Sequence, residues 1–240
     1  MSQKTLTILQ LYPRDMNIYG DWGNTLVLKK RLEWSGYQVR LIDYNPGDTF
    51  PEDVDIIVGG GGQDSGQIKI TKDLLVIGDK LKALADNGTP MLVVCGLYQL
   101  FGNFFRTRSG ETMHGIRIFN AETYGGDERM IGNIVTSSNE FGLIVGYENH
   151  SGQTNLLDGT IPFGRVIKGA GNNGEDTTEG ARYNNVIGTY MHGSLLPKNP
   201  SIADFMIRAA ATKKYGSYED PLIDDRFATE ARDITQRRPR

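Results

Sequence analysis

The sequence is poor in cysteine and histidine: its 240 residues include one cysteine and three histidines. A single cysteine excludes an intramolecular disulfide and fits a reducing compartment, so we expect a cytoplasmic protein. No apolar stretch approaches the roughly 20 residues that a membrane-spanning helix needs, and we expect no membrane span. The N-terminal "TLTILQLY" alternates apolar with polar residues and lacks a small-residue cleavage site, which favours a strand over a secretion signal.

An excess of positive charge is also missing. The chain has 26 Lys and Arg against 29 Asp and Glu, a net charge of −3, which excludes a global basic field for nucleic acid. Repeats, low-complexity tracts and clear linkers are absent too. We therefore expect a single domain over residues 1–240, with residues from roughly 228 to 240 forming a solvated tail.

Apolar strand-like segments alternate with helical ones in the first hundred residues. The strands are "TLTILQLY", "YQVRLIDY", "VDIIV" and "PMLVVC"; the helices are one that Asn24 caps and Gly36 ends, and one within residues 68–88. This order predicts an α/β fold with a parallel-rich central sheet flanked by helices. After about residue 110 the pattern changes to additional short strands between glycine-rich turns, followed by a late helix around residues 202–210.

The only cysteine, Cys95, ends an apolar strand and precedes Gly96 and the first turn of a helix. In an open parallel sheet, ligands bind beyond the carboxyl ends of the strands. A nucleophile on a tight strand-to-helix turn is exposed there, and the helix N-terminus favours the thiolate. The alternative is a small buried packing residue, since free cysteine is often buried.

Two further features bear on that choice. Four glycines in "VDIIVGGGGQDSGQ" allow backbone amides to face an anion, but no Gly-Lys-Ser/Thr follows and no metal-ligand spacing is present. A thiol nucleophile also needs a base. His192 follows the strand-like "NVIGTYM", while His150 has polar neighbours in "YENHSG", so spacing alone leaves both open; His114 is taken as a bystander.

The segments "VVCGLYQLFG", "GGGGQDSGQ" and "GTYMHG", in this order, resemble class I (triad-type) glutamine amidotransferases of the cobyric acid synthase-like branch. The resemblance implies a parallel-rich α/β fold and a cysteine nucleophile. It assigns Cys95 as the nucleophile and His192 as the general base and acid. It also implies an oxyanion hole formed by Gly60, Gly61 and Gly96.

Additional segments, "MNIYGDWGN", "FGLIVGYENHSGQT" and "GNNGED", are similar to glutaminase subunits of lipid II isoglutaminyl synthases. This narrower resemblance implies hydrolysis of L-glutamine and transfer of ammonia to a Mur ligase-like, MurT-type subunit in a heterodimer. That partner would use ATP and Mg²⁺ to amidate the D-glutamate α-carboxyl of lipid II at the inner face of the membrane. No cofactor is expected in this subunit. Arg129 aligns with a substrate-binding arginine, although a surface ion pair with Asp127 or Glu128 is the alternative.

One departure concerns the acid that orients the histidine. Many class I enzymes carry glutamate two residues after it, whereas this chain has Ser194 there. The resemblance implies an aspartate from the partner subunit; Glu148 is a local candidate, and absence is a third possibility. The roles of Asp21, Asp64 and Gln67 stay open. Two other functions compete: a non-catalytic interaction subunit, and a stand-alone cysteine hydrolase such as a peptidase.

Overall fold

The computed structural model describes residues 4–192 and 195–239. Its first sheet has the strand order β11-β12-β4-β3-β1-β2, in which every neighbouring pair is parallel except β11 with β12. The strands are β1 (Thr5–Leu11), β2 (Gln38–Tyr44), β3 (Ile56–Gly59), β4 (Met91–Val94), β11 (Ala181–Tyr183) and β12 (Val186–Thr189). The central strands β3 and β4 are buried along their whole length, as expected for a sheet covered on both faces.

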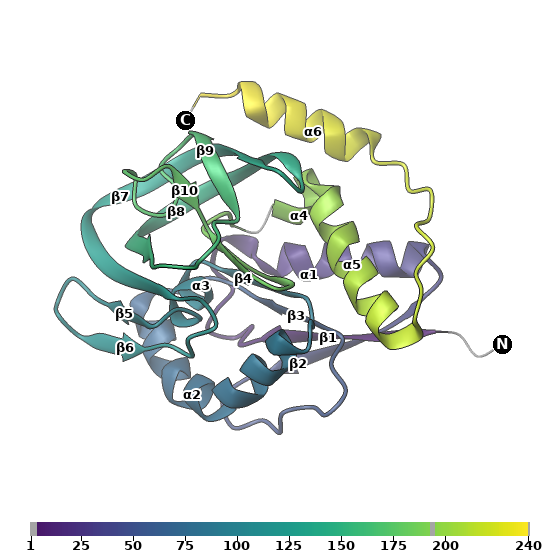
Figure 1. Cartoon of the computed structure of the whole chain (residues 1–240), viewed down its shortest axis with the longest axis horizontal. Helices are drawn as coiled ribbons and strands as arrows, with labels where there is room; N and C mark the ends of the chain where they lie inside the picture. Colours follow the sequence, from purple (N-terminus) through teal and green to yellow (C-terminus); the bar gives the residue numbers. More distant parts are fainter. Residues whose placement is uncertain (1–3, 193–194, 240) are drawn as a thin grey trace.

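Helices cover this sheet on both sides. Figure 1 shows α2 on one face and α1 with α5 on the other. The helices are α1 (Trp22–Trp34), α2 (Asp64–Asp86), α3 (Gly96–Leu100), α4 (Leu195–Lys198), α5 (Pro200–Tyr215) and α6 (Arg226–Arg237), with a short 3₁₀ turn at Ile18–Gly20. The predicted fold class is confirmed.

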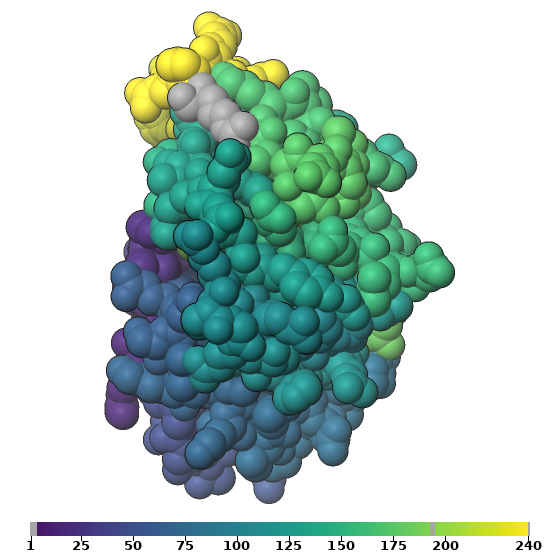
Figure 2. Space-filling model, turned by 90° about the vertical axis from the view of Figure 1, so that its left-hand side faces the viewer, coloured from purple at the N-terminus to yellow at the C-terminus, as the bar shows by residue number. Residues whose placement is uncertain are grey.

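A second, mostly antiparallel sheet is built around one long hairpin. Its strands are β5 (Phe104–Arg106), β6 (Thr112–His114), β7 (Ala121–Ser138), β8 (Gly142–Leu156), β9 (Gly164–Lys168) and β10 (Thr178–Glu179). The order is β10-β9-β7-β5-β6, with β8 paired to β7. Figure 2 shows the face on which the teal residues of this region adjoin the blue residues of the first half of the chain.

The expectation of only short strands in this half was wrong for β7 and β8. The glycines at 125 and 126, which look like a turn in the sequence, do not end the strand. They coincide with a shift in the β7–β8 register between Gly125 and Met130. A β-bulge bends a strand without terminating it, so one bent strand replaces the two segments that the glycines appeared to separate.

Two local predictions also need correction. Asn24 does not cap α1, which begins two residues earlier at Trp22; the buried Asn24 side chain accepts a hydrogen bond from the Leu196 amide at 3.1 Å. The predicted tail carries helix α6, whose residues are all at least partly exposed, and the chain beyond it bonds β7 through Asn133 Nδ2 and the Pro239 carbonyl at 2.8 Å. Across the described ranges, no helix combines the length and apolarity that a bilayer crossing requires.

Candidate active site

Cys95 lies on a strained turn between β4 and α3. Its backbone has φ 50° and ψ −105°, a left-handed conformation that non-glycine residues rarely adopt. Its amide donates to the Thr189 carbonyl at 2.8 Å, which ties the turn to the end of the neighbouring strand β12. Cys95 is buried, with 7% of the residue exposed, so the expected exposure is limited to its position in the wall of a cavity. Because such strain persists only where the surroundings impose it, the turn places the thiol at a defined point of the sheet edge.

His192 follows the end of β12 and is brought to the same edge. Its Nδ1 lies 3.2 Å from both carboxylate oxygens of Asp21, a residue of the loop between β1 and α1. Both side chains are nearly inaccessible to solvent, at 3% and 2%. Nδ1 therefore faces a carboxylate, while Nε2 has no hydrogen-bond partner among the described residues. This arrangement holds the imidazole in one orientation, as an orienting acid does in a catalytic triad.

The electrostatics of the cluster favour a charged imidazole. Burial lowers the pKa of His192, but the negative charge of the Cys95 thiolate and the hydrogen bond and charge of Asp21 outweigh burial, so the pKa lies above its ordinary value. A positively charged imidazole beside a thiol is the setting that activates cysteine as a nucleophile in general.

The glycine loop fits closely against this cluster. A Cβ on Gly61 would lie 2.8 Å from Cε1 of His192 and 3.0 Å from Cβ of Cys95, so only glycine leaves room for the pair. The Gly61 amide donates to Oδ2 of Asp21 at 2.6 Å. It is thus already engaged and is not directed at a substrate oxyanion, contrary to the role expected for it.

A cavity of about 350 Å³ opens beside Cys95. Among the described residues that line it, the glycine loop contributes Gly62 rather than Gly60 or Gly61. The lining also includes Tyr19, Asp64, Gln67, Gln99, Arg129, Asn149 and His150. Free glutamine is small enough to fit this volume. The cavity wall carries one cationic side chain, Arg129, and one carboxylate, Asp64.

Arg129 lies in that wall on the strand β7. Its Nε donates to Oδ1 of Asn149 at 2.6 Å and its Nη2 to the hydroxyl of Tyr19 at 2.9 Å. Within the described chain it forms no ion pair: Asp127 pairs with Arg108 instead, at 2.6 Å. The surface ion-pair alternative is therefore not what the structure shows, and Arg129 lines the cavity without an ion-pair partner among the described residues.

Gln67 and Glu148 have structural partners. The Gln67 amide donates to the Gly96 carbonyl at 3.1 Å and to Oε1 of Gln99 at 2.9 Å, which ties α2 to the turn that carries Cys95. Each carboxylate oxygen of the buried Glu148 accepts a backbone amide, from Ala170 at 2.8 Å and Gly171 at 2.9 Å. Its carboxylate thus holds the loop after β9.

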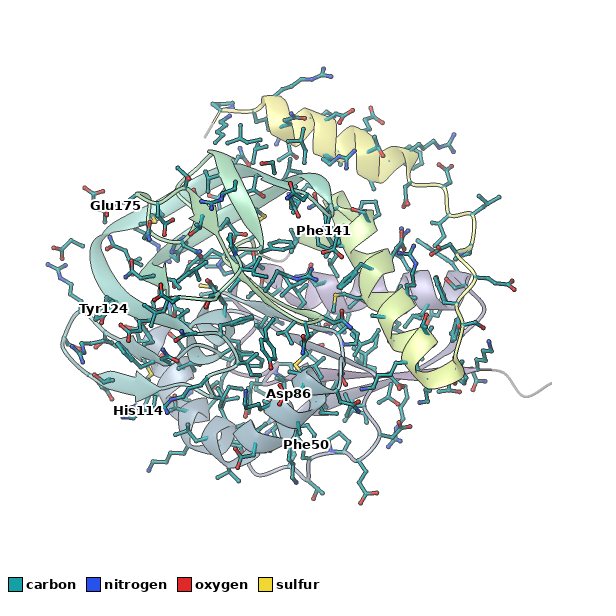
Figure 3. All side chains as sticks on the ribbon, in the orientation of Figure 1. Phe50, Asp86, His114, Tyr124, Phe141 and Glu175 are labelled. Carbon is teal, nitrogen blue, oxygen red and sulfur yellow. The ribbon has the colours of Figure 1, made fainter. Side chains whose placement is uncertain are left out.

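The other two histidines have different settings. Buried His150 bonds the Gly152 carbonyl through Nδ1 at 2.7 Å and stacks on Tyr190; burial lowers its pKa to about 3, so the ring is neutral. A neutral, buried ring is a poor match for the base of a thiolate–imidazolium pair. His114 is exposed on the β5–β6 hairpin (Figure 3). Ser194 lies outside the described residues.

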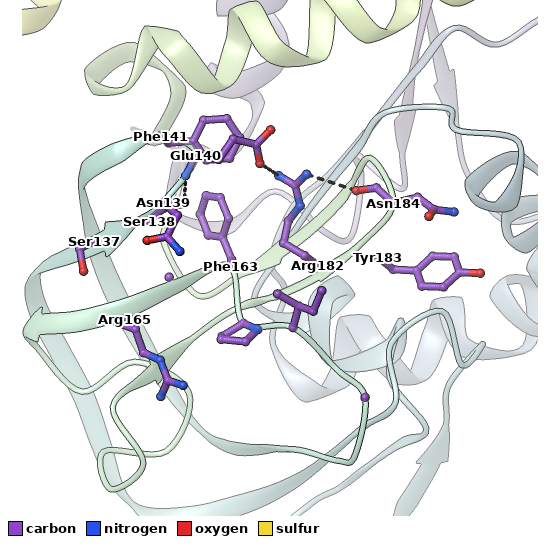
Figure 4. Close-up of a pocket in the computed structure, with 14 residues that line it drawn as sticks. Ser137, Ser138, Asn139, Glu140, Phe141, Phe163, Arg165, Arg182, Tyr183 and Asn184 are labelled. Atoms are coloured by element: carbon purple, nitrogen blue, oxygen red, sulfur yellow. Dashed lines mark hydrogen bonds and ion pairs between the residues drawn. The ribbon is translucent and has the colours of Figure 1, made fainter.

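A second and larger cavity, of about 640 Å³, lies by the β7–β8 turn. Figure 4 shows Arg182 in it, between Glu140 and the Asn184 carbonyl, beside Phe141. Its described lining contains no cysteine or histidine. The smaller cavity beside Cys95 is therefore the candidate active site. Among the described residues, no group of three or more His, Cys, Asp or Glu side chains is arranged to hold a metal ion.

Sequence reasoning missed the contact between Asp21 and His192. The two residues are 171 positions apart, and Asp21 looked like a turn or capping residue in "MNIYGDWGN". The available signal was its place after β1, since β1 lies next to β3 in the sheet and its carboxyl end opens at the same edge as the glycine loop. A carboxylate in such a loop is a candidate ligand-site residue.

Two proteins of known name resemble the chain along nearly its whole length. The chain is 38% identical over 231 residues to the lipid II isoglutaminyl synthase (glutamine-hydrolyzing) subunit GatD of Staphylococcus aureus, covering 95% of this chain and 94% of that protein. It is 36% identical over 238 residues to the subunit of the same name from Streptococcus pneumoniae, with 95% and 91% covered.

Solved structures share the fold at low sequence identity. A Thermotoga maritima glutamine amidotransferase superposes with a TM-score of 0.53 and 13% identity over 96% of this chain and 93% of that chain. PurLQS from the same organism gives a TM-score of 0.55 and 14% identity, over 85% and 98%. The model of the CobB/CobQ-like glutamine amidotransferase domain matches residues 7–200. The chain therefore belongs to the CobB/CobQ-like glutamine amidotransferase family.

Proposed function

We propose that this chain is a glutaminase that hydrolyses L-glutamine to glutamate and ammonia. The observation that carries the proposal is that Cys95 and Arg129 line one cavity, while His192, held by Asp21, packs with Cys95 against Gly61. The likeness along nearly the whole length of two proteins named glutamine-hydrolyzing subunits supports it. An interaction subunit needs neither a held imidazole beside a thiol nor an arginine in the adjoining cavity.

The reaction begins with attack of the Cys95 thiolate on the side-chain amide carbon of glutamine. The carbonyl π electrons move to oxygen and form a tetrahedral oxyanion. The His192 imidazolium then gives its proton to the leaving nitrogen, so that the C–N bond breaks and ammonia departs from a thioester. Neutral His192 next takes a proton from water, whose oxygen attacks the thioester, and glutamate leaves as the thiolate is restored.

The oxyanion needs donors that are free in the resting enzyme. As the first residue of α3, Gly96 has an amide without an intrahelical acceptor. Gly62 lines the cavity, and its amide makes no hydrogen bond with a described residue. We therefore assign the oxyanion hole to Gly96 and Gly62 in place of Gly60 and Gly61; each such donor contributes roughly 3 kcal/mol to catalysis.

Arg129 would bind the α-carboxylate of glutamine, because a guanidinium presents paired N–H donors to a carboxylate. Replacing it with lysine removes that paired geometry and keeps the charge. We expect Arg129→Lys to raise KM for glutamine by about tenfold to a hundredfold with a smaller change in kcat. Steady-state kinetics measure both. Arg108→Lys, which changes an exposed arginine of a surface ion pair, is the matched control; an unchanged KM in Arg129→Lys would refute the assignment.

The ammonia would pass to a Mur ligase-like subunit. We infer that this partner binds ATP and Mg²⁺ and amidates the D-glutamate α-carboxyl of lipid II in the cytoplasm, at the inner face of the membrane, while this chain needs no cofactor of its own. The support is the similarity to two subunits whose names include lipid II isoglutaminyl synthase. Because Asp21 already contacts His192, we expect some glutamine hydrolysis without the partner.

Covalent labelling tests the glutaminase site directly. A diazo-ketone or chloro-ketone analogue of glutamine should alkylate Cys95, identified by peptide mapping, with and without a Mur ligase-like partner. Glutamine should protect the thiol, and His192→Ala should slow labelling because the thiolate loses its counter-ion. A folded protein that remains unlabelled in both conditions would refute the proposal and leave an interaction subunit as the function.

A further inference from the structure

The turn at residues 17–21 contacts several parts of the active site. The Ile18 amide donates to the Gly61 carbonyl at 3.0 Å, and Oδ1 of Asn17 accepts the Trp22 amide at 2.8 Å, which closes the turn. Asp21, at its end, bonds the Gly61 amide and contacts His192. The segment "MNIYGDWGN" therefore packs against the glycine loop and the base, and the reaction described above uses only its aspartate.

Tyr19 is the residue at the tip of this turn. Its backbone is in the left-handed region, at φ 60° and ψ 18°, where a bulky side chain is unfavourable. Two contacts accompany that conformation. The ring lies edge-on against the His192 imidazole with 4.8 Å between centroids, and the hydroxyl accepts a hydrogen bond from Arg129 at 2.9 Å. Tyr19 as a whole is 46% exposed, whereas His192 is almost fully buried.

These contacts join the two ends of the substrate site. Arg129 has five N–H donors, and the two that are engaged point to uncharged oxygens, those of Asn149 and Tyr19. Such partners fix the plane of the guanidinium without neutralising it, so the remaining donors keep their charge for an anion. On its other side, the same Tyr19 ring covers the imidazole that must deliver a proton to the leaving nitrogen.

We propose that Tyr19 is a positioning residue for glutamine hydrolysis: its hydroxyl orients Arg129 toward the substrate carboxylate, and its ring shields His192 from solvent. This inference rests on the proposed glutaminase function. It assigns separate roles to the hydroxyl and to the ring, which can be removed one at a time. The hydroxyl acts on substrate binding, and the ring acts on the chemical step.

Tyr19→Phe removes the hydroxyl and keeps the ring and its backbone conformation. We expect KM for glutamine to rise about tenfold while kcat stays close to wild type, because one charge-assisted hydrogen bond to Arg129 is lost. Tyr147→Phe is the matched control, since Tyr147 is also exposed but does not line the cavity in the described structure. An unchanged KM in Tyr19→Phe, or the same rise in the control, would overturn the role of the hydroxyl.

Tyr19→Gly removes the ring and tolerates the left-handed backbone, so it adds no strain. Without the ring, water reaches His192 and weakens its electrostatic interactions with Asp21 and Cys95. We therefore expect kcat to fall at least about tenfold below that of Tyr19→Phe. Equal kcat in the two variants would overturn the role of the ring. Circular dichroism checks that both variants fold.

Isothermal titration calorimetry measures glutamine binding by Cys95→Ala without any turnover. It therefore tests the glutaminase function and the role of Tyr19 separately. If Cys95→Ala fails to bind glutamine, the proposed function fails. If it binds glutamine and the Cys95→Ala, Tyr19→Phe double variant binds equally well, the function stands and the assignment of Tyr19 is refuted. Weaker binding by the double variant supports both.

Discussion

Cys95→Ala should lower kcat for glutamine hydrolysis by at least about 10⁴-fold, because no other side chain of the cavity can form the thioester. The chain has one cysteine, so no second thiol can substitute for it. Cys95→Ser should be nearly as inactive, since a hydroxyl does not ionise beside an imidazolium as a thiol does. Release of glutamate, with and without a Mur ligase-like subunit, measures the loss.

The expected losses are not additive. Cys95 and His192 act as a pair, so a double alanine variant should be no slower than Cys95→Ala alone. Ser138→Ala, in the second cavity, is the control and should keep wild-type activity. Residual activity of Cys95→Ala above about a hundredth of the wild-type rate would show that the reaction does not pass through this thiol. Loss of a nucleophile lowers the rate by far more than about a hundredfold.

Asp21→Asn should reduce kcat by about 10³- to 10⁴-fold, the effect expected when a buried triad carboxylate becomes an amide. The amide can donate to Nδ1 and thus stabilise the wrong tautomer of His192. Asp15→Asn is a matched control, since Asp15 precedes the same turn and its side chain pairs with exposed Lys69.

The pH profile distinguishes this role from a general loss of stability. The carboxylate of Asp21 raises the pKa of His192, so removing the charge lowers that pKa. The imidazolium then loses its proton at lower pH, and the alkaline limb of kcat/KM should move to lower pH. An unshifted limb with wild-type kcat would instead return the orienting role to a carboxylate of the partner subunit.

Local sequence patterns placed Cys95 and His192 at strand ends, but the choice of His192 over His150 came from the family resemblance. Cys95 and His192 each follow a short apolar strand, and the parallel order of those strands brings their carboxyl ends together. Asp21 was not predictable in the same way, because its contact depends on the course of the turn after β1 and on the close fit of Gly61. A local sequence pattern predicts neither the course of that turn nor how closely Gly61 packs against it.

The glycines illustrate the same limit. The repeated glycines of the loop after β3 predict amides near the thiol, but not which of them is free. The structure uses Gly61 to hold Asp21 and leaves Gly62 at the cavity wall. Likewise, the glycines of β7 suggested a turn in the sequence. In the structure they lie at a β-bulge, and β7 pairs with β8 on both sides of it. In each case tertiary pairing decided between local conformations that the sequence permits.

The solitary thiol also determines how this chain would respond to an oxidant. Peroxide converts a reactive thiolate to a sulfenic acid, which a neighbouring cysteine can resolve as a disulfide. Cys95 has no such neighbour in its own chain, and the surrounding side chains leave it only 7% accessible. Its recovery from oxidation therefore depends on a thiol small enough to enter the glutamine cavity, and bound substrate would delay both the damage and the repair.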